Sequence, residues 1–269
     1  MSENDLSDLS PEARHQRWRE RRLSELTGPE SWPGLIGLIW LEPGANAVGS
    51  APECPVRLPE GPARLGVLDC QGGSVLWLPE GGAPIPLLTD AQGEPTPVAW
   101  GSFKFFVIER EGRLAVRLRD LAWQEKRPFA GIECFPYDPA WRIEADWETL
   151  AEPVRMEVPS VTGELKTVEV RHRAVFAHEG ENIALLPMEV DEDGAFFVFR
   201  DTTSGRLTYG AGRFLRAQPA RDGKLVLDFN RAYSPPCAFT PFATCPLPPP
   251  ENWLGLAVTA GELKYQGDH

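Results

Sequence analysis

The chain has 269 residues, with 39 Asp and Glu residues against 27 Lys and Arg residues, which gives a net charge of −12. This acidic balance argues against binding of a nucleic-acid backbone, which needs a basic face, although it leaves room for a local basic patch. The longest apolar run, residues 34–41, has eight residues. A membrane-spanning helix needs about twenty, so no membrane partner is expected.

The first 22 residues, MSENDLSDLSPEARHQRWRERR, are polar and charged and lack the pattern of a secretory signal. We therefore expect a cytoplasmic protein with reduced thiols. The five cysteines do not form a regular framework, because their number is odd and their spacing irregular. They are Cys54, Cys70, Cys134, Cys237 and Cys245.

Residues 10–26 carry a helix signal. Ser10 is a good capping residue, Pro11 suits the first helical position, and Thr27-Gly28-Pro29 ends the run. Five arginines in this stretch are typical either of a helix that binds a partner or nucleic acid, or of a solvated helix on the body of the protein. We expect residues 1–28 to form a helical arm.

After residue 33, short β-prone runs alternate with Gly and Pro turns at intervals of roughly ten residues, which favours an antiparallel barrel or sandwich. The chain is thus expected to be mostly β, with residues 29–269 as a single β-rich domain or two packed halves that divide near 150. The clearest strands are expected at Val75–Leu78, Phe103–Glu109, Leu114–Leu118, Thr167–Phe176, Phe196–Arg200, Leu207–Phe214 and Leu225–Phe229.

Two short segments of the chain resemble each other, and we call this similarity the internal echo. Phe105-Phe106-Val107 with Gly112-Arg113-Leu114 resembles Phe196-Phe197-Val198 with Gly205-Arg206-Leu207. Each would be a strand, a turn and a second strand. The echo is explained either by two similar β halves or by generic hairpin chemistry.

The segment from Asp228 to Glu262 contains seven prolines. Because proline fixes φ and has no N–H to donate, this segment is not expected to form a helix or a central strand. A long irregular segment of this kind usually serves function or closes the fold. Its apolar residues Phe239, Phe242, Leu247 and Trp253 predict that this proline-rich loop packs on the β core.

Cys237 and Cys245 are separated by seven residues, too many for one zinc knuckle. No metal or cofactor is therefore expected, and the pair is expected to be reduced. Two interpretations remain for these thiols: small buried side chains, or a reactive Cys237 that a residue distant in sequence activates.

His172 lies in the run Val168–Phe176, in which even positions are mostly apolar and odd positions mostly charged. Alternation along a strand places His172 on the inner face, either as a core histidine or as a pocket-lining base.

A set of polar residues gathers near the proline-rich loop and is the candidate ligand site. Its members are Arg213, Asp228, Asn230, Arg231, Tyr233, Cys237 and Asn252. Arg213 and Arg231 are the expected anion-binding groups, since a guanidinium stays charged when partly buried. Tyr233 or Asn230 would orient the ligand.

A purely structural network is the alternative for the same residues, with Asp201 or Asp228 pairing with the arginines. No catalytic residue can be named, because the phosphate-loop, nucleophile-elbow, dinucleotide and zinc-protease signatures are missing. Whether the protein is an enzyme is left open.

The chain resembles the bacterial family known as domain of unknown function 1684 over most of residues 20–262. The motifs that carry the resemblance are Trp40-Leu41 with Gly44, Arg117–Asp120, Phe135-Pro136 with Trp141-Arg142, Arg200–Gly205, Thr208-Tyr209 and the segment Asp228–Glu262. The resemblance implies that the C-terminal segment is an ordered family feature, and it implies no activity.

Two hypotheses for function follow. The first is a protein that binds or acts on a small, anionic metabolite in a pocket between the β core and the proline-rich loop. The second is a non-enzymatic β scaffold that acts through protein contacts. The oligomeric state is open in both.

Overall fold

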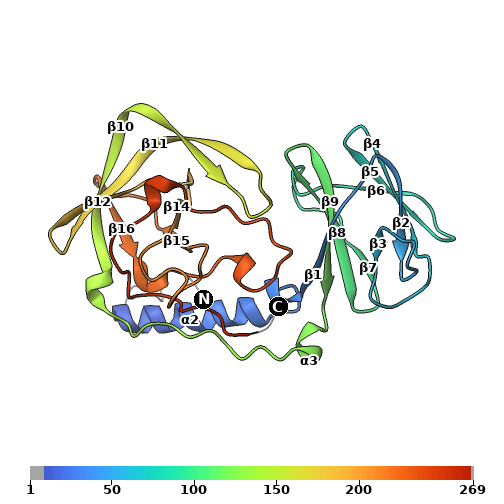
Figure 1. Cartoon of the computed structure of the whole chain (residues 1–269), viewed down its shortest axis with the longest axis horizontal. Coiled ribbons are helices and arrows are strands. Elements are labelled where there is room, and N and C mark those ends of the chain that lie inside the picture. Colours follow the sequence, from blue (N-terminus) through green and yellow to red (C-terminus); the bar gives the residue numbers. More distant parts are fainter. Residues whose placement is uncertain (1–8, 268–269) are drawn as a thin grey trace. The chain divides into compact units, whose positions relative to one another are not determined.

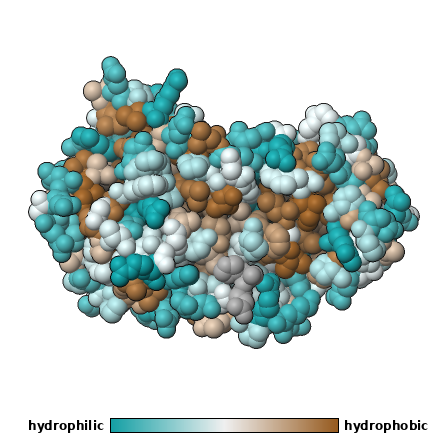
Figure 2. Space-filling model, in the orientation of Figure 1, coloured by the Kyte–Doolittle hydropathy of each residue, from teal (hydrophilic) through white to brown (hydrophobic). Residues whose placement is uncertain are grey.

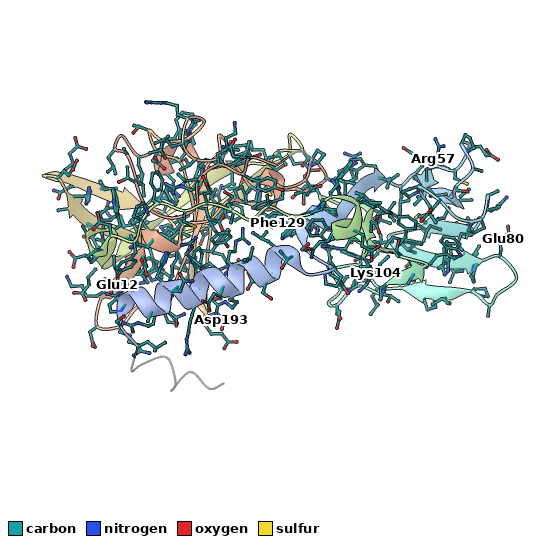
Figure 3. The ribbon with its side chains drawn as sticks, turned by 90° about the horizontal axis from the view of Figure 1, so that it is seen from below. Glu12, Arg57, Glu80, Lys104, Phe129 and Asp193 are labelled. Carbon is teal, nitrogen blue, oxygen red and sulfur yellow. The ribbon has the colours of Figure 1, made fainter. Side chains whose placement is uncertain are left out.

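The computed structural model describes residues 9–267 and divides into two compact units. Unit 1 consists of the residues up to Leu26 and those from Ala130 onward, and unit 2 consists of Thr27–Phe129. Phe129, the last residue of unit 2, is labelled in Figure 3. The division thus falls near 129 rather than near 150, because one long strand, β10 (Arg142–Pro159), runs through position 150.

The expected fold class is confirmed: the chain is mostly β, with several antiparallel sheets, a half-barrel and an N-terminal helix (Figure 1). Four of the seven expected strands lie within observed ones, and two more, at 196–200 and 225–229, extend one residue past the end of an observed strand. The seventh, at 207–214, is wrong for most of its length, because residues 207–212 form turns and only residues 213–214 belong to a strand.

Unit 2 contains two sheets, with strand orders β1-β9-β8-β7 and β3-β2-β4-β5-β6. Their facing surfaces enclose a core that includes Val48, Leu68, Phe105 and Val116. The strands are β1 (Leu35–Trp40), β2 (Gly44–Gly49), β3 (Val56–Arg57), β4 (Gly66–Gln71), β5 (Ser74–Pro79), β6 (Ile85–Leu87), β7 (Val98–Trp100), β8 (Phe103–Arg110) and β9 (Arg113–Asp120); the short helices are η1 (Trp32–Gly34) and α3 (Trp123–Lys126).

Unit 1 also contains two sheets, with orders β12-β11-β10-β16 and β13-β14-β15. A core that includes Ala174, Phe197, Leu215 and Leu227 fills the space between them. The remaining strands are β11 (Leu165–His178), β12 (Glu181–Leu185), β13 (Glu189–Asp191), β14 (Gly194–Phe199), β15 (Arg213–Ala217) and β16 (Lys224–Asp228); the 3-10 helices are η2 (Pro139–Trp141), η3 (Phe229–Arg231), η4 (Pro236–Ala238) and η5 (Pro250–Asn252).

The N-terminal helix α2 spans Pro11–Thr27, and Glu12 in Figure 3 marks its first turn. Ser10 caps it as expected, because its Oγ accepts a hydrogen bond from the N–H of Ala13 at 3.2 Å. The helix packs against unit 1 rather than standing apart as an arm, with His15 and Leu26 buried. The first eight residues of the expected arm lie outside the described residues.

The proline-rich C-terminal segment packs on unit 1 as short 3-10 turns and extended chain. Phe239 is buried, and Phe242 and Leu247 are half-buried. Trp253 differs from expectation: it is 55% exposed, with its Nε1 donating to the carbonyl of Pro248 and the guanidinium of Arg200 over its ring.

The two segments of the internal echo differ in structure. β8 and β9 form a regular hairpin around Glu111-Gly112. By contrast, Gly205-Arg206-Leu207 forms a turn closed by the hydrogen bond from Gly205 N to Thr208 O, and β14 pairs instead with the later strand β15. The echo therefore reflects two different connections after a similar first strand.

Among the described residues, no helix is both long and apolar enough to span a bilayer. The face drawn in Figure 2 carries apolar patches between hydrophilic side chains. Individually exposed apolar residues such as Leu165 and Leu207 are ordinary for a folded protein, so they assign no function.

Candidate functional site

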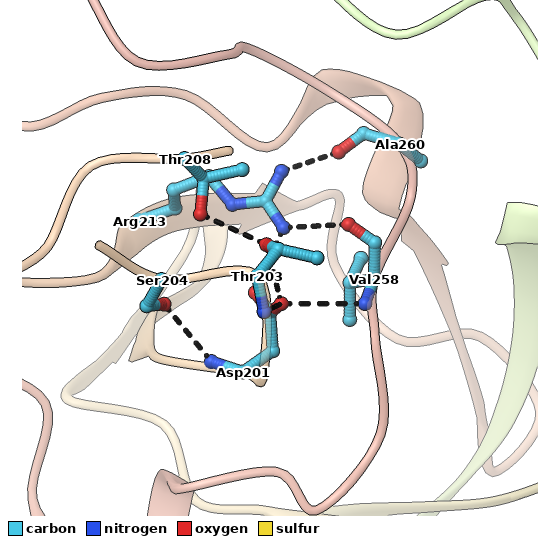
Figure 4. Close-up of polar contacts among 7 residues, drawn as sticks. All are labelled: Asp201, Thr203, Ser204, Thr208, Arg213, Val258 and Ala260. Carbon is cyan, nitrogen blue, oxygen red and sulfur yellow. Dashed lines mark hydrogen bonds and ion pairs between the residues drawn. The ribbon is translucent and has the colours of Figure 1, made fainter. Parts of the chain in front are cut away.

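A buried polar cluster surrounds Asp201 (Figure 4). Its Oδ2 accepts a hydrogen bond from Nη2 of Arg213 at 2.9 Å, and both side chains have no exposed surface. Its Oδ1 accepts hydrogen bonds from the N–H and the hydroxyl of Thr203 at 2.8 and 2.6 Å. A charged pair in this environment is held by several partners at once, as burial of charge requires.

Arg213 also joins the C-terminal segment to this cluster. Its guanidinium donates to the carbonyls of Ala260 and Val258. Burial lowers the pKa of Arg213, while the charge of Asp201 raises it. Arg213 therefore holds the C-terminal segment against the Asp201 cluster. With no exposed surface, it has the structural role that the sequence offered as the alternative to ligand binding.

Asn230 and Asn252 are also engaged by the fold. The amide of Asn252 donates to the carbonyls of Leu186 and Val198 and accepts from the N–H of Leu186. The amide of Asn230 donates to the carbonyl of Asp138 and to Asp228, and it accepts from the N–H of Asp138. Both side chains are buried, both donors of each amide are in use, and each amide oxygen accepts one hydrogen bond, so their contacts are made within the fold.

The expected inward position of His172 fits the alternation of β11. Its ring stacks on Trp147 with centroids 5.2 Å apart, and His178 stacks on Trp141 at 4.3 Å. These contacts give the two histidines a packing role on the inner face of the sheet.

A basic cavity is the strongest candidate for a binding site. It lies in unit 1 and has a volume of about 520 Å³, within the range of small-molecule sites. Besides the carboxylates of Glu144 and Asp228, it is lined by six cations: Arg14, Arg142, Arg216, Arg221, Lys224 and Arg231.

Strand pairing brings these cations together from distant parts of the chain. In the antiparallel pair of β10 and β16, Arg142 lies opposite Asp228 and Glu144 lies opposite Val226. The intervening residues Leu225 and Leu227 point into the core, so alternation turns the polar residues to the other face. β15, the loop after it and the first turn of α2 complete the lining.

The six cations differ in how far protein groups neutralise them. Lys224 pairs with Asp146 at 2.6 Å, and Arg231 pairs with Asp228 at 3.2 Å. Arg216 lies over the ring of Phe196 and hydrogen-bonds Tyr233. Tyr233 thus contacts a lining residue of the cavity but is not itself among the described lining residues.

The remaining three arginines line the cavity without a polar partner among residues 9–267. The side chains of Arg14, Arg142 and Arg221 make no hydrogen bond, ion pair or ring contact with any residue that the structure describes. A guanidinium carries five N–H donors, so each of these groups can donate hydrogen bonds to an oxyanion.

Several positive charges lie close to Arg231 and affect its pKa. Burial lowers the pKa of Arg231 and Asp228 raises it, and the nearby charges of Arg21, Arg14 and Arg142 lower it further. The Nε of Arg231 is buried and lies 3.2 Å from Oδ2 of Asp228, in an ion pair without hydrogen-bond geometry. An anion in the cavity would offset the repulsion among the arginines.

The sequence located this cavity only in part. Asp228 and Arg231 line it, whereas the other five expected site residues do not. The cavity lies against β10, β15, β16 and the start of α2, and its described lining ends at Arg231, before most of the proline-rich loop. Five cations were missed because no local motif joins them.

Comparison with known proteins identifies a family but no activity. The family model described as "Protein of unknown function (DUF1684)" matches residues 127–263. This range is narrower than the resemblance suggested, since it excludes the motifs at 40–44 and 117–120. It lies within the two-part unit 1 except for its first three residues. No functionally curated protein matches the chain.

Among solved structures, the chain is similar to the solution NMR structure of an uncharacterized protein from Haloarcula marismortui. The two are 35% identical over 50% of this chain and 77% of that chain, with a TM-score of 0.42. The family match spans just over half of the sequence and contains β10, β15, β16 and the C-terminal segment. On this match, the chain belongs to the DUF1684 family of proteins of unknown function.

Proposed function

We propose that this protein binds a compact, multiply charged oxyanion in the basic cavity of unit 1. The observation that carries the proposal is the gathering of six cations around one cavity in a chain whose net charge is −12. Three of these cations have no protein partner among the described residues, so their charge is left for another molecule.

The energetic argument concerns like charges. Two unit charges 4 Å apart repel by about 4 kcal/mol at the effective dielectric of a protein surface. Solvent and salt screen much of this repulsion at exposed groups, but the partly buried Arg231 is screened less. A bound anion with two or more charges removes the repulsion and forms charge-assisted hydrogen bonds in its place.

The lining also indicates the chemical class. Among the described lining residues there is no aromatic side chain, so they offer no stacking surface to a nucleotide base. Glu144 and Asp228 offer acceptors for hydroxyl groups beside the charged groups. Compact polyphosphates, phosphorylated polyols and polycarboxylates share the chemistry that fits.

The proposal is for binding rather than covalent catalysis. The described lining contains no Ser, Thr, Cys, His or Tyr that would serve as a nucleophile, and its lysine is paired with Asp146. Binding alone is therefore the simplest activity for this set of side chains.

Thermal unfolding at constant ionic strength tests the proposal. Phosphate, pyrophosphate, tripolyphosphate and citrate are added in turn, with chloride as the reference anion. The melting temperature should rise with the charge of the anion and saturate with concentration, because a ligand of the native state stabilises it by RT ln(1 + [L]/Kd). Equal melting temperatures in all five anions would contradict it.

A further inference from the structure

Cys237 and Cys245 lie in contact within the proline-rich segment. The backbone N–H of Cys237, in η4, donates to Sγ of Cys245 at 3.2 Å, and the Cys245 thiol hydrogen-bonds the Cys237 sulfur. No disulfide joins them, and all five cysteines fall within the described residues. Two thiols are thus held side by side without being bonded.

The surrounding backbone fixes this arrangement. The N–H of Val161 donates to the carbonyl of Cys245 at 3.0 Å, and the N–H of Leu247 donates to the carbonyl of Pro159 at 2.7 Å. On the other side, the hydroxyl of Tyr209 donates to the carbonyl of Cys237 at 2.9 Å. The pair therefore sits between the tip of the β10–β11 hairpin and the loop before β15.

The two sulfurs differ in access and in charge. Cys237 is half-buried, whereas Cys245 is 3% exposed. The hydrogen bond from Cys245 lowers the pKa of Cys237 against the opposing effect of burial, and Tyr209 lowers it further. Burial and the hydrogen bond to Cys237 in turn raise the pKa of Tyr209, so it stays a donor.

The other cysteines provide an internal contrast. Cys134 is also half-buried, but burial and the charge of Glu262 raise its pKa to about 11. Cys54 and Cys70 are buried in unit 2, and burial raises the pKa of Cys70. Only the 237–245 pair combines an accessible, activated sulfur with a second sulfur in contact.

We propose that Cys237 and Cys245 form a reversible oxidation site, in which a hydroperoxide oxidises Cys237 and Cys245 resolves the product as a disulfide. The Cys237 thiolate attacks one peroxide oxygen, the O–O bond breaks, and the leaving oxygen takes a proton as water or an alcohol. Sγ of Cys245 then attacks the sulfenic sulfur, the S–O bond breaks, and water leaves. A dithiol reductant returns both electrons and restores the thiols.

The first test measures alkylation of each cysteine in the wild-type protein and needs no variant. The reduced protein is treated with iodoacetamide at pH 7 and followed by peptide mass spectrometry. The pKa of Cys134 is about 11 and that of Cys237 is below the ordinary thiol value of 9.0. The thiolate fraction of Cys237 at pH 7 is then larger than that of Cys134 by more than about a hundredfold, and the lower intrinsic nucleophilicity of Cys237 offsets only part of this difference. Cys237 should react at least about tenfold faster than Cys134, and equal rates would overturn the proposal.

The second test follows the oxidation itself. Stoichiometric hydrogen peroxide should join the peptides that hold Cys237 and Cys245 with loss of two hydrogens, and dithiothreitol should reverse this. Cys245→Ser should stop at a sulfenic acid on Cys237 that dimedone captures, and Cys237→Ser should leave Cys245 unmodified. Cys134→Ser, as the matched control, should behave as the wild type.

The opposite results of the second test are equally clear. Peroxide that leaves the wild-type pair as thiols would overturn the proposal, as would dimedone capture on Cys134 before Cys237. Far-UV circular dichroism of each variant establishes that it is folded before peroxide is added. The wild-type result decides the matter if a variant does not fold.

Discussion

Nε of Arg22 donates to Oε1 of Glu262 at 2.8 Å, joining α2 to the C-terminal segment 240 residues later in the chain. Glu262 has no exposed surface, and its Oε2 accepts a second hydrogen bond from the N–H of Ser234 at 2.6 Å. The helix is thus anchored to unit 1 by a buried charge pair, in addition to its apolar contacts.

Breaking this pair should destabilise the protein strongly. Arg22→Met leaves a buried carboxylate unpaired, so the free energy of unfolding in urea should fall by about 3–5 kcal/mol. Arg21→Met is the matched control, because Arg21 pairs with Glu25 on the exposed face of α2 and such pairs contribute about 0–1 kcal/mol. Equal effects of the two substitutions would show that the helix is not held as described.

The pair of Asp201 and Arg213 leads to a different prediction, which concerns coupling. Arg213→Met and Asp201→Leu should each lower the free energy of unfolding by about 3–5 kcal/mol, since each leaves the other charge buried without its partner. The double variant should be more stable than the sum of the two losses implies, because it leaves no unpaired charge. Urea unfolding of all four proteins measures the coupling, and strict additivity would contradict a direct pair.

Alternation made much of the β structure predictable from sequence. In β16 the buried residues Leu225 and Leu227 alternate with less buried ones, and β11 places His172 on the inner face as its pattern indicates. The stretch 207–212 was misread because Thr208 is drawn into the Asp201 cluster through its contact with Thr203. A side-chain hydrogen bond within a loop competes with strand pairing, and β propensity does not show it.

The candidate site was harder to predict than the fold. Asp228 and Arg231 were found because they stand close together in the sequence. Arg14, Arg142 and Arg221 meet them only through helix packing and the register of β10 on β16, which no local pattern specifies. Arg213 was assigned to the site because sequence alone does not distinguish a buried arginine from one that lines a cavity.

Stability should depend on pH through His15, which is buried between Trp18 and Tyr137. Burial lowers the pKa of His15 from its ordinary value of 6.5 despite the opposing charge of Asp228. The unfolded chain therefore binds more protons than the native state below about pH 6.5, so stability is complete above that pH and is lost as the pH falls.

The measurement is urea unfolding at pH 7.5 and at pH 5.5. The wild type should lose up to about 1.4 kcal/mol per pH unit through this group. His15→Phe keeps a ring between its neighbours but takes up no proton, so its loss over the same interval should be smaller. An identical pH dependence in both proteins would remove His15 as the cause.

Calorimetric titration with tripolyphosphate tests whether the basic cavity binds a multiply charged oxyanion. Arg142 and Arg221 line the cavity, and replacing them breaks no hydrogen bond or ion pair between side chains of the described residues. The matched control replaces Arg57 and Arg155, which are exposed and line no part of the cavity. Each double substitution removes two positive charges, so both change the net charge from −12 to −14.

The wild type should bind one tripolyphosphate per chain. Arg142→Gln/Arg221→Gln should weaken binding by about tenfold or more, since a hydrogen bond to a charged group contributes about 1.5–3 kcal/mol. Arg57→Gln/Arg155→Gln should bind as the wild type does. No binding to the wild type, or an equal loss in both double variants, would contradict the account.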